Sequence, residues 1–437
     1  MSPGTTRRTF LRDALAGVVV LPTTLGASPS PSIPGAGRGL LHPSPALPPQ
    51  ASPRDEAYWA LVRAQFAFRE SRVPMNAANL CPSPRAVAET VSRLTHDIDV
   101  DCSFQNRAKF DELLETSRRM VADHLGVSPE EIALVRNTSE ANNTINAGLP
   151  LEDGDEVVVW DENHPTNNVA WDVRAARYGI RVRRVAVPAR PAGTQDLIDP
   201  FVAALTDRTR VLALTHISNL SGIRLPVREI TEAAHRRGIH VHVDGAQSFG
   251  AVHVDLREMG CDSYTASAHK WFMGPKEAGV LYVRENRISS IWPAGVAPGW
   301  GTDADPDVAG ARKFESLGQR DDACLASIGT TVAFHREIGA AAIDARVTEL
   351  ATALKEGVTA LGAPLVTPME PHLSGGVCIL EVAGDRNAVY QRLYEEYGIA
   401  GAPTGGLRFS PHIYNTMAHV ERAVAAVAAM RSDIVGD

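Results

Sequence analysis

Cysteine pairs are missing from this sequence. Its five cysteines are well separated, their number is odd, and no two of them form a C-x-x-C pair. A disulfide framework uses an even set of cysteines, and a structural zinc site typically uses closely spaced pairs. Neither kind of site is therefore suggested by Cys81, Cys102, Cys261, Cys324 and Cys378.

Dense runs of positive charge are also missing beyond the N-terminus. The chain has 43 Lys and Arg against 51 Asp and Glu, and its net charge of −8 is spread over 437 residues. Without a basic patch, we expect neither nucleic acid nor an anionic membrane surface as a partner. The composition, 44% hydrophobic and 22% charged, is ordinary for a soluble globular enzyme. The length allows two or more domains, or one large α/β domain with an appendage.

The N-terminus lacks an apolar run long enough for a stable membrane span. Arg7 and Arg8 precede Phe10, Leu11 and a short apolar stretch that contains a proline and ends in small residues. We interpret residues 1–27 as a twin-arginine signal peptide, which predicts export to the periplasm or the cell exterior. The alternative is a chance arginine pair in a disordered tail.

Residues 28–54 are rich in proline, serine and glycine, and they contain little apolar surface to bury. This composition predicts an extended linker. The folded part is therefore expected to start near Asp55.

From about residue 84, helix-like and strand-like segments alternate. Apolar residues recur at helical spacing over 84–98, 107–126 and 227–238. Short apolar segments predict strands at 131–137, 155–164, 181–188, 210–218, 239–246, 262–270 and 277–285. This alternation predicts an α/β fold with a mostly parallel sheet that is covered on both faces.

Ligands of such open sheets bind beyond the carboxyl ends of the strands. The polar residues that follow the predicted strands are therefore the first candidates for a functional site. They are Thr138, His164, Ser218, Asn219, Asp244 and Lys270.

The last third of the chain has a different pattern. Residues 326–362 form long Ala-rich helical stretches, and two strand candidates follow at 375–384 and 406–415. The pattern predicts a smaller α+β domain over 311–437, after an N-terminal segment and a large domain over 55–310. We find no internal repeat.

Lys270 stands in the stretch "ASAHKWFMGP", between small and aromatic neighbours. A surface lysine needs no such setting, whereas a nucleophilic lysine must be partly desolvated to lose its proton near neutral pH. Asp244 ends an apolar strand 26 residues earlier; taken alone, it is an ordinary helix N-cap candidate. Together, the two residues suit a pyridoxal phosphate site, with the lysine on the cofactor aldehyde and the aspartate on the pyridine nitrogen.

The region "VHVDGAQSFGAVHVDLREMGCDSYTASAHKWFMGPKEAGVLYV" resembles class V, cysteine desulfurase-like, pyridoxal-phosphate enzymes, which include the isopenicillin N epimerases and related C–S lyases. The resemblance covers about residues 74–430. It implies the type I fold of pyridoxal-phosphate transferases, with a seven-stranded sheet in the cofactor-binding large domain. It also implies that Lys270 is the Schiff-base lysine and Asp244 the partner of the pyridine nitrogen. Gln247 would then contact the phenolic oxygen, and Ser267 and His269 the phosphate.

Other segments resemble the family at its remaining cofactor contacts. "RNTSEANN" resembles the phosphate-binding turn, which implies that Thr138, Ser139 and Glu140 contact the cofactor phosphate. An ordinary capping box would explain the same pattern. His164 in "ENHPTNNVAW" would stack on the cofactor ring and take part in catalysis. Asn219 in "THISNLSG" would lie near the phenolic oxygen.

The resemblance also implies a homodimer with shared active sites and an amino-acid substrate. Thr302 in "GWGTDAD" would complete the phosphate site of the neighbouring subunit. Arg408 in "GLRFSPHIYNT" would grip the substrate carboxylate, for which its planar fork is suited, whereas the alternative is a surface arginine at a strand end.

One departure from the family separates possible reactions. Cysteine desulfurases carry a catalytic cysteine shortly before this arginine, but "YGIAGAPTGGLR" contains none. Cys378 lies in an apolar strand pattern and is expected to be buried and inert. A persulfide route is therefore not expected.

Several reactions at the α-carbon of an amino acid or its derivative stay open. The segment "VPMNAANLCPSPRAV" looks most like chains grouped with the isopenicillin N epimerases, which favours an epimerase or racemase. The alternatives are a C–S lyase working by β-elimination, an aminotransferase, and a cofactor-bearing binding protein without turnover. The fold is common to the enzymatic reactions, and pocket shape decides among them.

Overall fold

The structure, a computed structural model, describes residues 47–48, 54–296 and 310–436. The predicted signal peptide, nearly all of the predicted linker, and Thr302 lie outside these ranges. Asp55, where the folded part was expected to start, caps the first described helix through hydrogen bonds from Ala57 and Tyr58. No helix within the described ranges is both long and apolar enough to cross a membrane.

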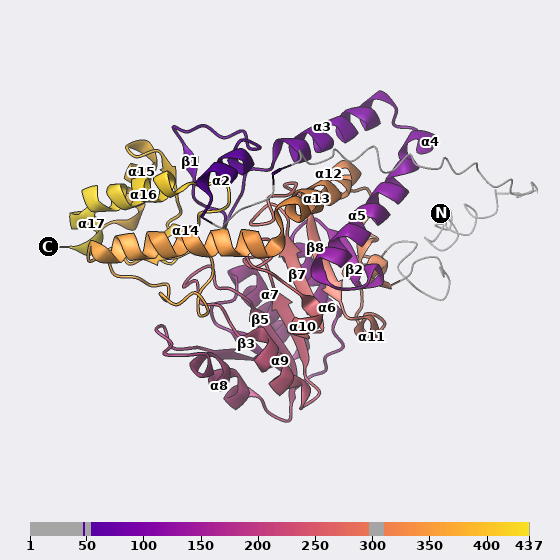
Figure 1. The fold of residues 1–437 in the computed structure, drawn as a ribbon. Helices are drawn as coiled ribbons and strands as arrows, with labels where there is room; N and C mark the ends of the chain where they lie inside the picture. The colour runs from indigo at the N-terminus through magenta and orange to yellow at the C-terminus, as the bar shows by residue number, and fades with distance from the viewer. Residues whose placement is uncertain (1–46, 49–53, 297–309, 437) are drawn as a thin grey trace, which may run out of the picture. The chain divides into compact units, whose positions relative to one another are not determined.

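A seven-stranded sheet forms the centre of the part of the fold that precedes the C-terminal helices (Figure 1). Its order is β2-β8-β7-β6-β5-β3-β4. β8 runs in the direction opposite to the other six strands, which are parallel to one another. All seven segments predicted as strands contribute to it, and the predicted mostly parallel α/β sheet is confirmed. The strands are β2 (Ile132–Val135), β3 (Glu156–Trp160), β4 (Arg181–Val185), β5 (Thr209–Thr215), β6 (His240–Asp244), β7 (Ser263–Ser267) and β8 (Gly279–Val283).

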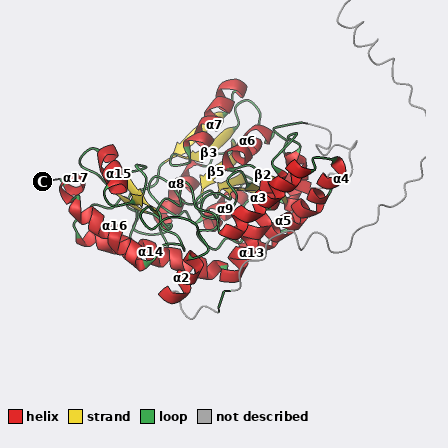
Figure 2. Cartoon of the chain, turned by 90° about the horizontal axis from the view of Figure 1, so that it is seen from above, coloured by secondary structure: helices red, strands yellow, loops and turns green. Residues whose placement is uncertain are grey.

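Helices and two short 3-10 segments precede, separate and follow these strands (Figure 2). Those in the first two thirds are α2 (Glu56–Arg63), α3 (Arg85–Val100), α4 (Phe104–Arg107), α5 (Lys109–Leu125), η1 (Pro129–Glu131), α6 (Thr138–Gly148), α7 (Pro165–Tyr178), α8 (Gln195–Ala204), α9 (Val227–His235), α10 (Leu256–Met259) and α11 (Glu285–Ile288). Those that follow are η2 (Gly310–Glu315), α12 (Asp322–Ala326), α13 (Ile328–Ile338), α14 (Ala340–Ala360), α15 (Arg386–Glu395), α16 (Met417–Ala429) and α17 (Arg431–Val435).

Successive side chains of the sheet enter two different cores, because side chains alternate across a strand. One core packs against α6 and α7 and contains Ala133, Val135, Val157, Val159, Val211 and Ala213. The other packs against α5, α8 and α9 and contains Ile132, Leu134, Val158, Trp160, Leu212 and Leu214. Burial on both faces explains why β2, β3 and β5 read as nearly continuous apolar runs in the sequence.

A separate core forms near the C-terminus. It joins the second half of α14 and α15–α17 to the antiparallel pair β9 (Cys378–Leu380) and β11 (Leu407–Phe409). Val73 and Met75 also belong to this core, and β1 (Val73–Pro74) pairs in parallel with β10 (Ile399–Ala400). The predicted Ala-rich helical stretch is divided at Gly339, whose φ of +92° ends α13 before α14 begins. A segment from the start of the fold thus helps to build the C-terminal core.

Candidate active site

A pocket of about 320 Å³ lies at the carboxyl ends of the strands. Asp244 and Ser267 are the last residues of β6 and β7, Thr138 begins α6 after β2, and His164 caps α7 after β3. The structure thus brings together seven of the residues predicted for the site: Thr138, Ser139, His164, Asp244, Ser267, His269 and Lys270.

Lys270 lies partly buried in this pocket. Burial holds the pKa of its amine below the ordinary lysine value; the carboxylate of Asp244 opposes this shift and the guanidinium of Arg408 adds to it. A lower pKa increases the fraction of neutral amine, the form that acts as a nucleophile or base. The setting expected from the sequence is therefore present.

Asp244 is 1% exposed, and both of its carboxylate oxygens accept a hydrogen bond. Asn142 Nδ2 donates to Oδ2 at 2.8 Å, and the backbone N–H of Ala246 donates to Oδ1 at 2.9 Å. A turn follows β6, and the next helix, α10, begins only at Leu256. Asp244 is therefore not a helix N-cap.

Asn142 is a site residue that the sequence analysis did not find. Its Oδ1 accepts from Thr265 Oγ1 at 2.7 Å and lies 3.0 Å from His242 Nε2, so its amide is held in one orientation toward Asp244. The alternation in "HVHVD" and "SYTAS" could have pointed to it. On each of these strands, polar residues share one face, and that face lies under α6.

The N-terminus of α6 forms the other end of the pocket. The backbone N–H of Thr138 donates to Ser267 Oγ at 2.9 Å, and the two hydroxyl oxygens are 2.7 Å apart. Ser139 lies in the first turn of α6, and the N–H groups of a first helical turn have no acceptor within the helix and favour an anion. Nδ1 of His269 is buried without a hydrogen-bond partner, and burial, with Lys270 and Lys276, lowers the pKa of this imidazole to about 4.

Glu140 does not line this pocket. Its carboxylate accepts from the backbone N–H of Arg136 at 2.7 Å and from Arg136 Nε at 3.1 Å, while Asn137 is the N-cap of α6. The structure thus gives the carboxylate a local capping contact, and the predicted cofactor contact of Glu140 stays a prediction.

His164 has a defined ring tautomer. The backbone N–H of Thr166 donates to Nδ1 at 3.3 Å, and Thr166 Oγ1 lies 2.8 Å from the same atom. Because Nδ1 accepts from an N–H, the neutral ring carries its proton on Nε2. Burial, with the charge of Lys270, lowers the pKa of His164, so the neutral ring is the favoured form.

Gln247 and Asn219 were predicted at the phenolic oxygen but do not line this pocket. Gln247 is buried, its Nε2 donates to the carbonyl of Ala78 at 2.9 Å, and its Oε1 accepts from Trp271 Nε1 at 2.7 Å. The carbonyl of Asn219 accepts from Arg408 Nη1 at 2.9 Å. The predicted contacts of both side chains with the cofactor stay predictions.

Arg408, on β11, is not a surface arginine, because it is 3% exposed. Besides its bond to Asn219, its Nη2 donates to Asn76 Oδ1 at 3.2 Å, whereas its Nε is buried without a partner. Burial lowers the pKa of its guanidinium to about 10, and its charge acts on both His164 and Lys270. Asn76 was not predicted, although it lies in the "VPMNAANL" segment that carried part of the resemblance.

All five cysteines lie in the described ranges, and none of them lines the pocket. Cys378 is buried in β9, and burial raises the pKa of its thiol to about 12. Cys81 is also buried, with Sγ 3.3 Å from the hydroxyl of Tyr414, and burial raises its pKa to about 12 as well. Such thiols are poor nucleophiles, because the thiolate is the reactive form.

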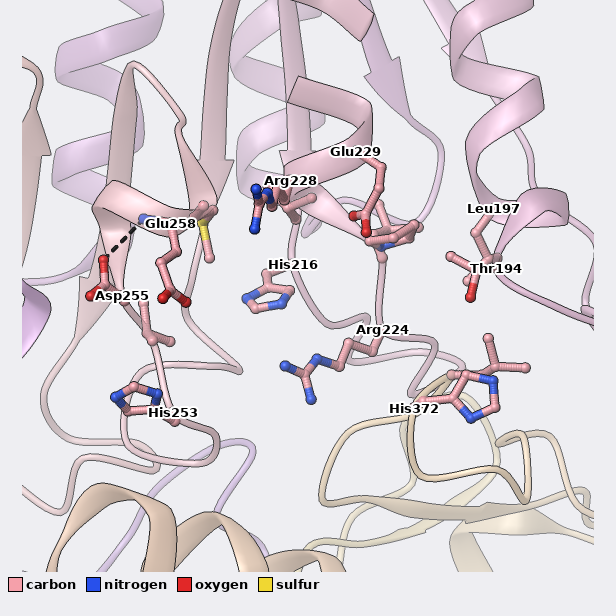
Figure 3. Close-up of a pocket in the computed structure, with 16 residues that line it drawn as sticks. Thr194, Leu197, His216, Arg224, Arg228, Glu229, His253, Asp255, Glu258 and His372 are labelled. Atoms are coloured by element: carbon pink, nitrogen blue, oxygen red, sulfur yellow. Dashed lines mark hydrogen bonds between the residues drawn. The ribbon is translucent and has the colours of Figure 1, made fainter. Parts of the chain in front are cut away.

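A second cavity of about 420 Å³ shares no residue with the Lys270 pocket (Figure 3). Figure 3 shows His216 between Arg224 and Arg228 in this cavity. His216 is 5% exposed, and burial, together with Arg224, lowers the pKa of its imidazole to about 3. None of the described residues predicted for the site lines this second cavity.

The residues of the Lys270 pocket fit pyridoxal phosphate. A lysine amine with a lowered pKa suits the aldehyde, a buried carboxylate suits a protonated ring nitrogen, and the N-terminus of α6 beside the unpartnered His269 Nδ1 suits a phosphate. A metal-binding cluster of three or more His, Cys, Asp or Glu is absent from the described ranges.

Known proteins of similar sequence point the same way. The model of the aminotransferase class-V family matches residues 100–423. The isopenicillin N epimerase of Amycolatopsis lactamdurans is 29% identical over 389 residues, which cover 84% of this chain and 98% of that protein. A probable cysteine desulfurase of Vibrio cholerae is 28% identical over 399 residues, which cover 84% of this chain and 96% of that protein.

Solved structures share the fold. The apo cysteine desulfurase of Thermococcus onnurineus superimposes with a TM-score of 0.77 at 22% identity, covering 86% of this chain and 98% of that one. The cystine C-S lyase C-DES, in complex with its product cysteine persulfide, gives 0.74 at 22% identity, covering 82% and 98%. The predicted fold of pyridoxal-phosphate transferases is thereby confirmed. This chain belongs to the aminotransferase class-V family, and its cofactor is pyridoxal 5′-phosphate.

Proposed function

We propose that this protein acts at the α-carbon of an amino acid or amino-acid derivative and inverts its configuration, as an epimerase or racemase. The observation that carries the proposal is the partly buried amine of Lys270, which shares one pocket with Asp244 and lies within the electrostatic reach of Arg408. The similarity to two isopenicillin N epimerases over more than four fifths of the chain supports this choice of reaction.

The cofactor, when bound, supplies an electron sink for the charge that is left when the α-proton departs. Asp244 would hold a proton on its ring nitrogen, with the carboxylate oriented by Asn142. Thr138, Ser139, Ser267 and His269 would hold its phosphate. The neutral amine of Lys270 would take the α-proton as a general base, for which its lowered pKa is suited.

Arg408 would bind the substrate carboxylate. A guanidinium pairs with both oxygens of a carboxylate, and the buried, unpartnered Nε leaves a donor available. His164, which lines the Lys270 pocket, would offer a neutral Nε2–H donor. The roles proposed for Arg408 and His164 involve no cysteine thiol.

β-Elimination by a C–S lyase is the second candidate. It begins with the same removal of the α-proton, and a pocket without cysteine suits it because the sulfur leaves with the product. Transamination is the third: the proton would be returned to the cofactor instead of the α-carbon, and the amino group would have to pass to a second substrate.

We further propose a homodimer and export by the twin-arginine route. Val169, Val173, Tyr178 and Trp292 are half exposed or more around a cavity of about 670 Å³ between α6 and α7. Thr166 lines this cavity and the Lys270 pocket, so a partner seated there would lie beside the active site. Export rests on the paired arginines of the N-terminal sequence, and the mass of the mature N-terminus tests it.

The experiment for the reaction is incubation of the holoenzyme with a panel of amino acids in heavy water, followed by mass spectrometry and chiral chromatography. Deuterium at the α-carbon with inversion and an intact side chain supports an epimerase. A ketoacid with ammonia and a lost side chain replaces it with a lyase. No α-proton exchange with any amino acid of the panel contradicts the proposal.

A further inference from the structure

Glu162 makes an unusual pair of contacts. It lies between β3 and α7, two residues before His164, and it does not line the Lys270 pocket. One carboxylate oxygen, Oε2, accepts hydrogen bonds from the hydroxyls of both Ser218 and Ser221, the latter at 2.5 Å. Bonds to a charged acceptor are short and about twice as strong as neutral ones.

The two serine hydroxyls also hold the turn in which they stand. Ser218 Oγ accepts from the backbone N–H groups of Leu220 at 3.0 Å and Ser221 at 3.1 Å, and Ser221 Oγ accepts from that of Ile223 at 3.2 Å. A hydroxyl has one proton, and here it goes to Glu162, which leaves the lone pairs for the N–H groups. The carboxylate therefore orients both hydroxyls as acceptors for the 218–223 turn.

The same turn is confined from its other side by Gly405. A Cβ at Gly405 would stand 2.0 Å from the carbonyl oxygen of Leu220, and the φ of Gly405 is +71°. Within this turn, the carbonyl of Asn219 accepts from Arg408 Nη1 at 2.9 Å. One side of the guanidinium is thus held by a turn that Glu162 fixes through Ser218 and Ser221.

We propose that Glu162 is a positioning residue for Arg408 and thereby sets the selectivity of the site for a substrate that bears a free α-carboxylate. The inference rests on the proposed function of Arg408. It requires no contact between Glu162 and the substrate, because its effect passes through the Ser218–Ile223 turn and the carbonyl of Asn219.

The first test measures the turn itself and needs no substrate. In the holoenzyme, hydrogen exchange of the amides of Leu220, Ser221 and Ile223 should become about tenfold faster or more in E162A, since the hydroxyls lose their charged acceptor. E162Q keeps a carbonyl oxygen as acceptor and should exchange more slowly than E162A. E229A, which removes an exposed carboxylate from α9, is the control and should not differ from the unmodified protein. Unchanged exchange in E162A overturns the proposal.

The second test separates positioning from general damage. With an amino acid that exchanges its α-proton, E162A should raise KM about tenfold while kcat changes less, and S221A should follow in the same direction. With the corresponding amino-acid amide, which lacks the carboxylate, E162A should act like the unmodified enzyme. An equal loss for acid and amide overturns the selectivity role.

R408Q distinguishes the role proposed for Arg408 from the role proposed for Glu162. If R408Q weakens the acid but not the amide, and E162A does the same to a smaller degree, both assignments hold. If R408Q treats acid and amide alike, the role proposed for Arg408 fails and the selectivity role of Glu162 fails with it, while the exchange data still report whether Glu162 holds the turn.

Discussion

Two regions around Lys270 are built differently. The pocket that contains Asp244 is built from the ends of neighbouring strands and the first turns of α6, and its polar groups are linked through Asn142, Thr265 and His242. Arg408 does not line this pocket, and its surroundings join three segments that are distant in sequence, represented by Asn76, Asn219 and Arg408 itself. The first region depends on one sheet, whereas the second depends on how the C-terminal core meets that sheet.

This difference separates two kinds of defect. Changes at the strand ends should remove chemistry, because they alter groups aimed at the reacting centre. Changes around Arg408 should mainly weaken substrate binding, because they alter a charge that is distant from the departing proton.

The largest effect is expected from Lys270→Ala. Loss of the base should slow α-proton exchange at least about 10³-fold, since a positioned general base contributes 10²–10⁴-fold. Exchange in heavy water measures it, and Lys109→Ala, at the start of α5 and not among the residues that line the pocket, is the control. Retained exchange in Lys270→Ala would remove Lys270 from the mechanism.

Asp244→Asn should have the next largest effect. The amide has the same shape but no charge, so kcat should fall about 10²-fold or more with little change in KM. Asn142→Ala, which removes only one donor to Asp244, should lower kcat less, by about tenfold. If Asn142→Ala lowers kcat as much as Asp244→Asn does, the supporting role of Asn142 is contradicted.

Arg408→Lys should raise KM about tenfold or more while kcat falls less, because a lysine cannot replace two N–H donors held in one plane. Steady-state kinetics with the amino acid and its amide measure this. If kcat falls as far as it does in Asp244→Asn, the proposed difference between the Asp244 and Arg408 regions is contradicted.

The smallest expected effect is a shift in the titration of Lys270, measured in the cofactor-free protein by the pH dependence of its reaction with an acylating reagent. Burial lowers the pKa of this amine, so reactivity should rise with pH and reach half its maximum below the ordinary lysine value. Arg408→Gln removes a cation that lowers this pKa, so its curve should move to higher pH. Asp244→Asn removes an anion that raises this pKa, so its curve should move to lower pH. Shifts of the opposite sign would contradict these electrostatic assignments.

Sequence reasoning found much of the Lys270 pocket from a local rule, since parallel strands bring their carboxyl ends to one edge. This rule named Thr138, His164, Asp244 and Lys270, which line the pocket, but also Ser218 and Asn219, which do not. Ser267 came from the family resemblance. Reasoning from the sequence pattern also predicted all seven strands. The apolar runs of β2, β3, β5 and β8 are typical of strands buried on both faces, whereas β4 is largely exposed.

What it missed depends on contacts between distant segments. Asn76 and Arg408 are 332 positions apart, and nothing local to Asn76 indicates that it will accept a hydrogen bond from that guanidinium. The partners of Gln247, Ala78 and Trp271, were not predicted either, and the predicted contact of Gln247 with the cofactor stays a prediction. Asn142 could have been found from the polar residues that alternate with apolar ones along β6 and β7, because a buried polar face needs a polar partner on the helix that covers it. No single residue of these strands points to Asn142 by itself.

The close contact at Gly405 also limits how this enzyme could change by mutation. A side chain at Gly405 would meet Leu220, and one at Gly406 would have its Cβ 2.0 Å from the carbonyl oxygen of Leu380. Both residues also have φ values, +71° and +147°, that side chains strongly disfavour. The two positions directly before the strand of Arg408 are therefore closed to a single-step acquisition of a thiol. A thiol at either glycine would require the loop to be rebuilt, so a cysteine gained by one mutation in this loop would have to arise at another position.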